Sequence, residues 1–257
     1  MYLIGDIGNT ETKIFLFNEK LKLKKKWTIS SISLTNTYLD SKIKLTLIEI
    51  SKIKKILFSS VVPNTFQLIK KFLIKKNKKL KIYEKKQIDF KKLIKLKVNR
   101  KQVGSDRIAN AIGVTNNNKN YIVIDFGTAT TFDIVGKNGS YDGGIIAPGI
   151  NLSLEALYSA TSRLPKIAIR QLNDEKNTLI GRNTIAAIES GVYWGYVCMI
   201  EGLIFKLKKI YKNSKILVTG GLSSIFIKNI STIDLVEKDL TILGLAHMYI
   251  SHFKINR

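Results

Sequence analysis

Short apolar runs separated by polar turns predict β-strands at several places along the chain. Residues 2 to 17 read YLIGDIGNTETKIFLF, two apolar runs joined by a polar turn. Runs of this length, rich in Ile, Phe and Tyr and bounded by Gly and Asn, are typical of β-hairpins. We therefore predict a hairpin at the start of the chain, with an unusually polar turn that begins at Asp6 and ends at Lys13.

The hairpin pattern recurs half a chain later. Residues 121 to 135 read YIVIDFGTATTFDIV, again an apolar run that ends in Asp-x-Gly, then small hydroxyl-bearing residues, then a second β-rich run. Internal similarity of this kind indicates two lobes of related fold. The alignment pairs three turn positions: Asp6 with Asp125, Gly8 with Gly127 and Thr12 with Thr131.

The segments between the hairpins have the pattern of helices and further strands. The polar run from 116 to 120 is the best candidate for a boundary, which gives an N-terminal lobe of residues 1–118 and a C-terminal lobe of residues 119–257. Hairpins that alternate with helices favour an α/β architecture in which helices cover mixed sheets. Two such lobes would leave a cleft between them.

Charge and composition add little to the functional picture. The 43 basic and 19 acidic residues give a net charge of +24, which suggests a polyanionic partner. However, the lysines are spread along the chain and are not interleaved with stacking aromatic residues, as KLKLKKK at 20 to 26 illustrates. We interpret them as solvated basic faces and expect no specific nucleic-acid partner.

The rare residues exclude several classes of site. A single cysteine, Cys198, excludes an intramolecular disulfide, fits a reducing compartment and is expected to be buried in its apolar surroundings. His247 and His252 lack partners at zinc-ligand spacing. No signal-peptide pattern and no apolar run of about 18 residues is present. We expect a soluble, cytoplasmic protein that does not enter a membrane.

The turns carry the side chains that a phosphate group requires. A backbone that approaches a phosphate closely needs a residue without Cβ, together with N–H and hydroxyl donors. Asp6 is suited to hold Mg²⁺ through water, and Lys13 to meet the phosphates as a point charge. One such turn alone would be read as ordinary hairpin chemistry. Its recurrence, with a later glycine turn at Gly220, favours nucleotide binding between the lobes. The predicted phosphate-binding residues are Gly8, Asn9, Thr10 and Thr12 in the first lobe and Gly127, Thr128, Thr130 and Thr131 in the second.

This arrangement resembles the sugar kinase, actin and Hsp70 superfamily, and within it the type III pantothenate kinases. The matching stretches, in family order, are DIGNTETK at 6 to 13, SSVVP at 59 to 63, GSDR at 104 to 107, DFGTATTFD at 125 to 133, GGIIAPG at 143 to 149 and GRNT at 181 to 184. The resemblance implies an actin-like ATPase fold with two ribonuclease-H-like lobes and an ATP cleft. It also implies transfer of the γ-phosphoryl group of ATP to pantothenate, which yields 4'-phosphopantothenate, the first intermediate toward coenzyme A.

The resemblance also implies roles for individual residues. ATP with Mg²⁺ would contact Asp6, Ile7, Gly8, Asn9, Thr10, Glu11, Thr12, Lys13 and Thr128. Pantothenate would contact Gly104, Ser105, Asp106, Arg107 and Thr184, and Asp125 would bind a monovalent cation, K⁺ or NH₄⁺. A structural alternative for Asp125 is a carboxylate that closes the turn. The family's dimers place active sites at the subunit boundary, so we expect a homodimer.

Asp106 is the residue we select as the catalytic base. It begins a predicted helix directly after Gly104, where the backbone can approach a substrate, and Arg107 beside it can pair with a carboxylate as a fork. The alternative is that Ser105 and Asp106 only cap the helix, with the acid favoured by the helix dipole. The two roles are compatible, because a capped position also fixes a catalytic carboxylate.

The match departs from the family's pattern just before this helix. In LKVNRKQVGSDR, Arg100 replaces a proline, Gln102 replaces a glutamate, and Lys97 falls where a substrate-contacting tyrosine would be. These changes remove one substrate contact but leave the base, the arginine and the ATP turns in place. The alternatives that remain are a non-catalytic relative of the same fold and a kinase for another small hydroxy acid.

Overall fold

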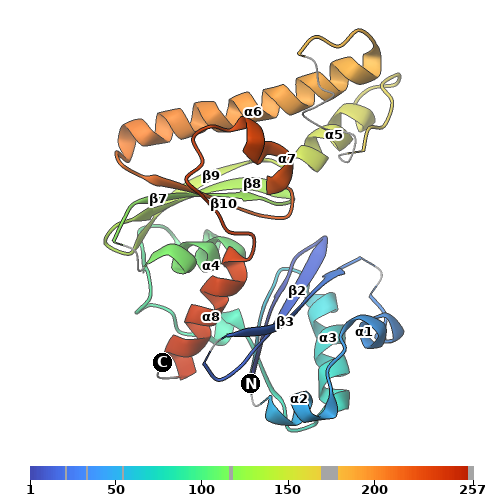
Figure 1. Ribbon diagram of the computed structural model, residues 1–257, viewed down its shortest axis with the longest axis vertical. Coiled ribbons are helices and arrows are strands. Elements are labelled where there is room, and N and C mark those ends of the chain that lie inside the picture. The colour runs from blue at the N-terminus through green and yellow to red at the C-terminus, as the bar shows by residue number, and fades with distance from the viewer. Residues whose placement is uncertain (21, 33, 54, 116–117, 169–178, 254–257) are drawn as a thin grey trace. The chain divides into compact units, whose positions relative to one another are not determined.

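The computed structural model describes residues 1–253 other than 21, 33, 54, 116–117 and 169–178 (Figure 1). The chain forms two units. The first comprises Met1–Asn116 and Leu240–Arg257, and the second comprises Asn117–Asp239. Part of the predicted boundary, Asn116 and Asn117, lies outside the described residues.

The first unit contains a five-stranded mixed sheet in the order β3-β2-β1-β4-β5. The predicted hairpin forms its centre, with β1 antiparallel to β2 and parallel to β4. Every residue of β1 from Leu3 to Gly5 is buried, because helices and loops cover both faces at this point. The strands are β1 (Tyr2–Ile7), β2 (Glu11–Phe17), β3 (Leu23–Ser30), β4 (Lys55–Ser60) and β5 (Lys81–Glu84).

Two groups of helices pack in this unit. On one side, apolar residues of α1 and α3, such as Leu39, Phe66 and Ile69, join Leu3 and Ile14 of the sheet in one core. Elsewhere in the unit α4 packs against α8. The helices are α1 (Asn36–Lys42), α2 (Leu47–Lys52), α3 (Pro63–Lys76), α4 (Ser105–Val114) and α8 (Leu240–Phe253), with 3₁₀ turns η1 (Lys85–Gln87) and η2 (Arg100–Gln102) and the short strand β6 (Lys95–Leu96).

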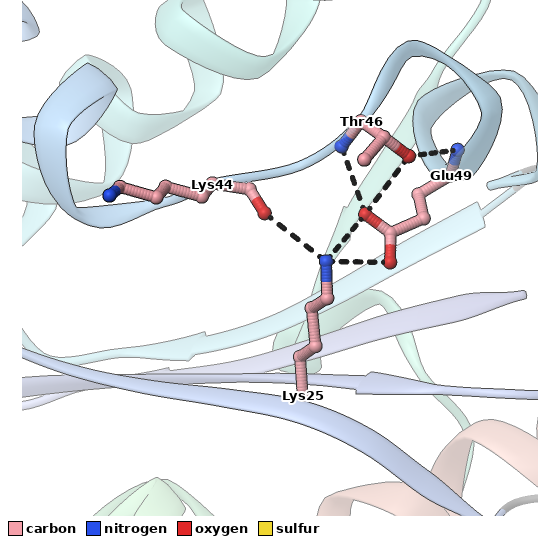
Figure 2. A network of polar contacts seen from close by, with 4 residues as sticks. All are labelled: Lys25, Lys44, Thr46 and Glu49. Atoms are coloured by element: carbon pink, nitrogen blue, oxygen red, sulfur yellow. Dashed lines mark hydrogen bonds and ion pairs between the residues drawn. The ribbon is translucent and has the colours of Figure 1, made fainter.

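A polar network ties α2 to the sheet of the first unit (Figure 2). Thr46 and Glu49 form a capping box: the Glu49 N–H donates to the Thr46 hydroxyl at 3.1 Å, and the Thr46 N–H donates to Glu49 Oε2 at 2.9 Å. Lys25 of β3 forms an ion pair of 2.8 Å with Glu49 Oε1. Burial opposes ionisation of Glu49, but these donors together hold its pKa below the usual 4.5.

The second unit contains a mixed sheet with the order β11-β10-β7-β8-β9. One face packs against the long helix α6 (Figure 1). Tyr193, Tyr196 and Ile200 of the helix belong to one core with Phe126 and Phe132 of the strands. The strands are β7 (Tyr121–Phe126), β8 (Ala129–Gly136), β9 (Ser140–Pro148), β10 (Lys215–Thr219) and β11 (Leu235–Val236). The helices are α5 (Ile150–Ser159), α6 (Thr184–Ile210) and α7 (Ser223–Phe226), followed by the 3₁₀ turn η5 (Ile227–Asn229).

The last helix, α8, groups with the first unit, whereas the sequence prediction of one boundary near residue 118 put it in the C-terminal lobe. The physical reason is close helix packing. A Cβ built on Gly244 of α8 would lie 1.8 Å from the Ala109 carbonyl oxygen of α4, and one on Gly113 would lie 2.7 Å from Leu240. The sequence predicts the helix itself but not its partner.

Two further expectations concern the surface. Cys198 is exposed on α6, contrary to the prediction that it is buried, because the helix turns Tyr196, Val197 and Ile200 toward the sheet. None of the helices in the described parts of the chain is long and apolar enough to cross a membrane.

Candidate active site

The turn between β1 and β2 is closed by its own backbone. The Gly8 N–H donates to the Glu11 carbonyl at 2.9 Å, so this donor is already used. Asn9 and Thr10 form the exposed tip of the turn, and Glu11 is exposed beside them. Ile7 is fully buried, so only its backbone could face a ligand. The accessible polar groups of the turn therefore lie at its tip.

Asp6 lies in a row of polar side chains across the first sheet. It is paired with Lys13 of β2 on one side and with Ser59 of β4 on the other. Side chains at paired positions of adjacent strands stand on the same face of a sheet. Asp6 is partly exposed, so an acid, a cation and a hydroxyl meet where these strands end.

Ser59 was not assigned a role from sequence, but its surroundings are unusual. It is 1% exposed, and its hydroxyl makes no hydrogen bond to any residue that the structure describes. A buried hydroxyl without a partner calls for a bound water or ion. The described residues contain no group of three or more His, Cys, Asp or Glu able to hold a metal. Mg²⁺ does not require such a group, because it keeps several waters and binds one or two carboxylates together with substrate phosphates. The Asp6 carboxylate, with the Ser59 hydroxyl beside it, fits this kind of site.

The turn between β7 and β8 resembles the first but is one residue shorter. Gly127 N–H donates to the carbonyl of Ala129 at 3.2 Å, two residues on, whereas in the first turn the acceptor is three residues on. Asp125 is consequently paired with Thr131 in its hairpin, while Asp6 is paired with Lys13. The sequence alignment is therefore shifted by one residue after the turns: Thr12 corresponds to Thr130, not to Thr131.

These two equivalent threonines point into the protein. Thr12 and Thr130 are both 0% exposed. The Thr12 hydroxyl is 2.8 Å from that of Ser31, and the Thr130 hydroxyl is hydrogen-bonded to the phenol of Tyr196, whose pKa is raised by burial. Their hydroxyls are committed to the interior, so the phosphate-donor role predicted for them is left to their neighbours in each turn.

Asp125 sits in a tightly built corner of the second unit. It is paired with Thr131 of β8 and Thr219 of β10. Gly220 has φ +93°, and a Cβ built there would lie 2.6 Å from Asp125 Oδ1 and from the Phe126 backbone. A side chain at Gly220 is therefore excluded both by backbone conformation and by space. The turn residue Thr128 is exposed, and its carbonyl lies against Gly149, where a Cβ would be 2.1 Å away.

A buried carboxylate supports this corner. Thr131 donates its hydroxyl to Asp133 Oδ2 at 3.3 Å, and Tyr141 donates to Asp133 Oδ1 at 2.7 Å. Asp133 is 0% exposed. The hydroxyl proton of Thr131 is thus directed toward Asp133, which leaves the oxygen lone pairs of Thr131 for a neighbour. Sequence reasoning missed this role, although the Asp was visible at the end of DFGTATTFD.

Asp106 lies in the first turn of α4, but it is not the cap. The N-cap is Gly104, which has no side-chain hydrogen bond, so the alternative that Ser105 and Asp106 cap the helix is wrong. The part of that alternative that places an acid in the first turn, where the helix dipole favours it, is confirmed. A Cβ on Gly104 would lie 2.5 Å from Asp106 Oδ1, so the carboxylate lies directly over the glycine. Ser105 and Arg107 flank it and are partly exposed. Gly104 thus creates the space in which this carboxylate sits.

Thr184 is the exposed first residue of α6. Asn183 caps the helix, with its side chain accepting from the Ala186 N–H at 2.9 Å. A pocket of about 660 Å³ opens here between α5 and α6, lined by Thr184 with Arg182 and Gly191 among others. Thr184, Thr128 and Asp125 belong to the second unit, and the Asp6–Lys13 turn, Asp106 and Arg107 to the first.

Comparison with known proteins identifies the family. The type III pantothenate kinase family model matches residues 2–206. The type III pantothenate kinase of Pelagibacter ubique is 45% identical over 246 residues, which cover 95% of this chain and 97% of the relative. The type III pantothenate kinase of Sphingopyxis alaskensis is 38% identical, and the match covers 97% of this chain and 97% of the relative. The chain belongs to the type III pantothenate kinase family. The family resemblance seen in the sequence is thereby confirmed.

Solved structures confirm the fold class of this type III pantothenate kinase family member. A Campylobacter jejuni protein described as a Baf family transcriptional activator superposes with a TM-score of 0.59 at 21% identity, covering 98% of both chains. A Listeria monocytogenes protein described as an N-acetylmannosamine kinase gives 0.55 at 12% identity, covering 97% of this chain and 98% of its own. The two-sheet architecture is that of the actin-like ATPases and sugar kinases.

Proposed function

We propose that this protein transfers the γ-phosphoryl group of ATP to the primary hydroxyl of pantothenate, the first step of coenzyme A biosynthesis. The observation that carries this proposal is the family match over residues 2–206, which includes the turn at Asp6 and the carboxylate at Asp106. The relatives that match over nearly their full length are type III pantothenate kinases.

Asp106 is the group that acts on the acceptor. A transferred phosphoryl group needs an acceptor hydroxyl that is oriented and relieved of its proton. The Asp106 carboxylate is held over Gly104 at the start of α4, where it is partly exposed and can accept that proton. Arg107 on the same helical turn presents a planar fork suited to the pantothenate carboxylate. The helix N-terminus adds a positive end next to the anionic substrate.

The first turn binds the phosphates of ATP. Since the Gly8 N–H closes the turn, the donors that remain are at the exposed tip, at Asn9 and Thr10. Lys13 stands beside Asp6 in the ladder and neutralises charge on the phosphates. In the second unit, the exposed Thr128 makes the corresponding contact.

Two cation sites complete the proposal. Asp6 holds Mg²⁺ through water with the buried Ser59 hydroxyl nearby. Asp125, with the lone pairs of Thr131 and Thr219 beside it, holds K⁺ or NH₄⁺. The Asp133 carboxylate orients Thr131 by accepting a hydrogen bond from its hydroxyl. When bound, the cations offset the negative charge of the nucleotide phosphates.

We also propose a homodimer formed through α6. Gly191, Gly195, Cys198 and Gly202 are exposed on one side of the helix, at spacings of three and four residues. A Cβ at any of the three glycines would meet nothing within 4 Å. Phe205, 62% exposed, continues the same side. A smooth, partly apolar helix face allows a second helix to approach closely.

A coupled assay of ADP release tests the proposed function. The purified protein should phosphorylate pantothenate with ATP and Mg²⁺, and omission of both K⁺ and NH₄⁺ should collapse the rate. A panel of other small hydroxy acids should react far more slowly. Faster turnover of another hydroxy acid would replace pantothenate as the substrate. Absence of turnover with every acceptor would indicate a non-catalytic relative.

A further inference from the structure

A buried lysine in the first unit has no role in the site described above. Lys85 opens the 3₁₀ turn η1 directly after β5, and it is only 7% exposed. Its ammonium lies 5.0 Å from the centre of the Phe90 ring. Lysine is rarely buried to this extent unless its charge is paired, so its surroundings require an explanation.

Among the described residues, no protein group pairs directly with this charge. The ammonium of Lys85 makes no hydrogen bond or ion pair with any residue in the described part of the chain. The preceding carboxylate, Glu84, instead forms an ion pair with Lys86. A buried cation without a partner is costly, and a ligand that brings a negative charge would remove that cost.

A second cation shares the same aromatic ring. The Arg100 guanidinium carbon lies 4.5 Å from the centre of Phe90, which is itself 2% exposed. Arg100 opens η2, the turn that leads into α4 and Asp106. The two cations at this ring repel each other and together create a strongly positive local potential, which favours binding of an anion.

The electrostatics place this point close to the proposed catalytic carboxylate. Burial first, and the charge of Arg100 second, lower the pKa of Lys85 from 10.5 to about 8, while the charge of Asp106 opposes the change. Asp106 is therefore near enough to be felt by Lys85, yet the two do not form an ion pair. A ligand whose reacting hydroxyl is at Asp106 can therefore bring an anionic end toward Lys85.

We propose that Lys85 and Arg100, packed against Phe90, form a cationic subsite that binds the carboxylate of the acceptor beside Asp106. The inference rests on the proposed function, because it takes Asp106 to face the acceptor. A carboxylate has acceptor positions for several donors, so Arg107 and Lys85 can bind it together. An ATP phosphate would satisfy the same cations, because Glu84 is paired with Phe58 of β4, which brings η1 beside Ser59. The acceptor is favoured because Arg100 opens η2, the turn that leads directly into α4 and Asp106.

The test compares neighbouring lysines that differ in burial. Lys85→Met keeps the apolar stem and removes the charge, Lys85→Arg keeps the charge, and Lys86→Met is the exposed control. We expect Lys85→Met to raise the KM for pantothenate about tenfold or more, the effect of losing a charge-assisted hydrogen bond. Lys85→Arg should restore most of the affinity. The KM for ATP should stay the same in both Lys85 variants. Lys86→Met should leave the KM values for pantothenate and for ATP unchanged.

An uncharged acceptor identifies the group that is bound. Pantothenol carries an alcohol in place of the carboxylate, so its KM, or its inhibition constant if it is not turned over, should be the same for the unmodified protein and Lys85→Met. An equal loss for both acceptors would show a packing defect and overturn the subsite. A rise confined to the KM for ATP would assign the cations to phosphate and would also overturn it.

A second pair of variants guards against misfolding of Lys85→Met. Arg100 and Lys101 are both exposed, so Arg100→Leu and its control Lys101→Leu should fold. Arg100→Leu should raise the KM for pantothenate severalfold, and Lys101→Leu should not. If the unmodified protein does not phosphorylate pantothenate, the proposed function fails and the subsite fails with it. Normal turnover with unchanged KM in Lys85→Met and Arg100→Leu refutes the subsite alone.

Discussion

At the scale of single residues, the acceptor site depends on one glycine and one acid. The Asp106 carboxylate occupies the space that a side chain at Gly104 would fill. The sequence indicates Asp106 as the base but does not show whether it caps the helix or lies in the first turn. The two positions are only two residues apart, and an acid is favoured at both.

Replacement of Asp106 by Asn should separate chemistry from folding. The amide has nearly the same shape but cannot accept the hydroxyl proton, so kcat should fall about 10²- to 10⁴-fold. The KM for ATP and the thermal unfolding midpoint should stay close to their original values. Asp89→Asn, at an exposed carboxylate of the same unit, serves as the control. Near-normal kcat in folded Asp106→Asn would remove Asp106 from the base role.

Lys85 should destabilise the free protein while it serves the ligand. The pKa of Lys85 is about 8 in the folded protein and near 10.5 in the unfolded chain. Below pH 8 its charge therefore lowers the free energy of unfolding by up to about 3 kcal/mol. This free energy rises as the pH increases from 8 to 10.5, because the folded protein loses its proton first. Lys85→Met should therefore be more stable than the unmodified protein at pH 7, with a smaller difference near pH 10. Denaturant unfolding measures both. A variant less stable at pH 7 would contradict this, and Lys86→Met should show neither effect.

At the scale of elements, the strands were predictable and their register was not. Apolar runs and polar turns predict both hairpins, and β1–β2 and β7–β8 form as expected. The one-residue difference between the turns depends on which carbonyl accepts the Gly8 or Gly127 N–H, a choice that the letters alone do not specify. A shift of one residue reverses which side chains face the core. The shift makes Thr130, and not Thr131, the inward-facing equivalent of Thr12.

Gly220 should be the most restrictive position of the cation corner. Gly220→Ala adds a methyl group 2.6 Å from Asp125 and from the Phe126 backbone, at a φ of +93° that favours glycine. The unfolding midpoint should fall, and the K⁺ concentration for half-maximal activity should rise. Gly139→Ala is a matched control, since its φ is +72° but nothing lies within 4 Å. If both variants behave alike, backbone strain and not displacement of Asp125 explains the loss.

At the scale of the whole molecule, family and fold were predictable because many weak motifs occur in one order. The division into units was less so. Helix α8 follows the second unit in sequence but packs on α4, through the tight contacts of Gly244 with Ala109 and of Gly113 with Leu240, which appear only in the folded structure. Similarly, the exposed side of α6 appears only after the helix is docked on its sheet, since its sequence is apolar nearly all round.

The proposed dimer makes a prediction about assembly. Gly195→Arg places a long charged side chain on the exposed small-residue side of α6, so the protein should become a monomer in light scattering after size exclusion. Activity should fall if the sites lie at the subunit boundary. Lys212→Glu, just beyond the end of α6, also changes a surface charge and should leave the dimer intact. A monomeric unmodified protein would contradict the proposal.

Direct detection of the product tests the proposed phosphoryl transfer to pantothenate. Phosphorus NMR of a reaction with ATP, Mg²⁺, K⁺ and pantothenate follows the fate of the phosphoryl group atom by atom. We predict that the γ-phosphate signal of ATP is replaced by the signal of one phosphomonoester on the primary hydroxyl of pantothenate, in equal amount to the ADP formed. Loss of ATP to inorganic phosphate alone, or a phosphoryl group on any other atom of the acceptor, would contradict it.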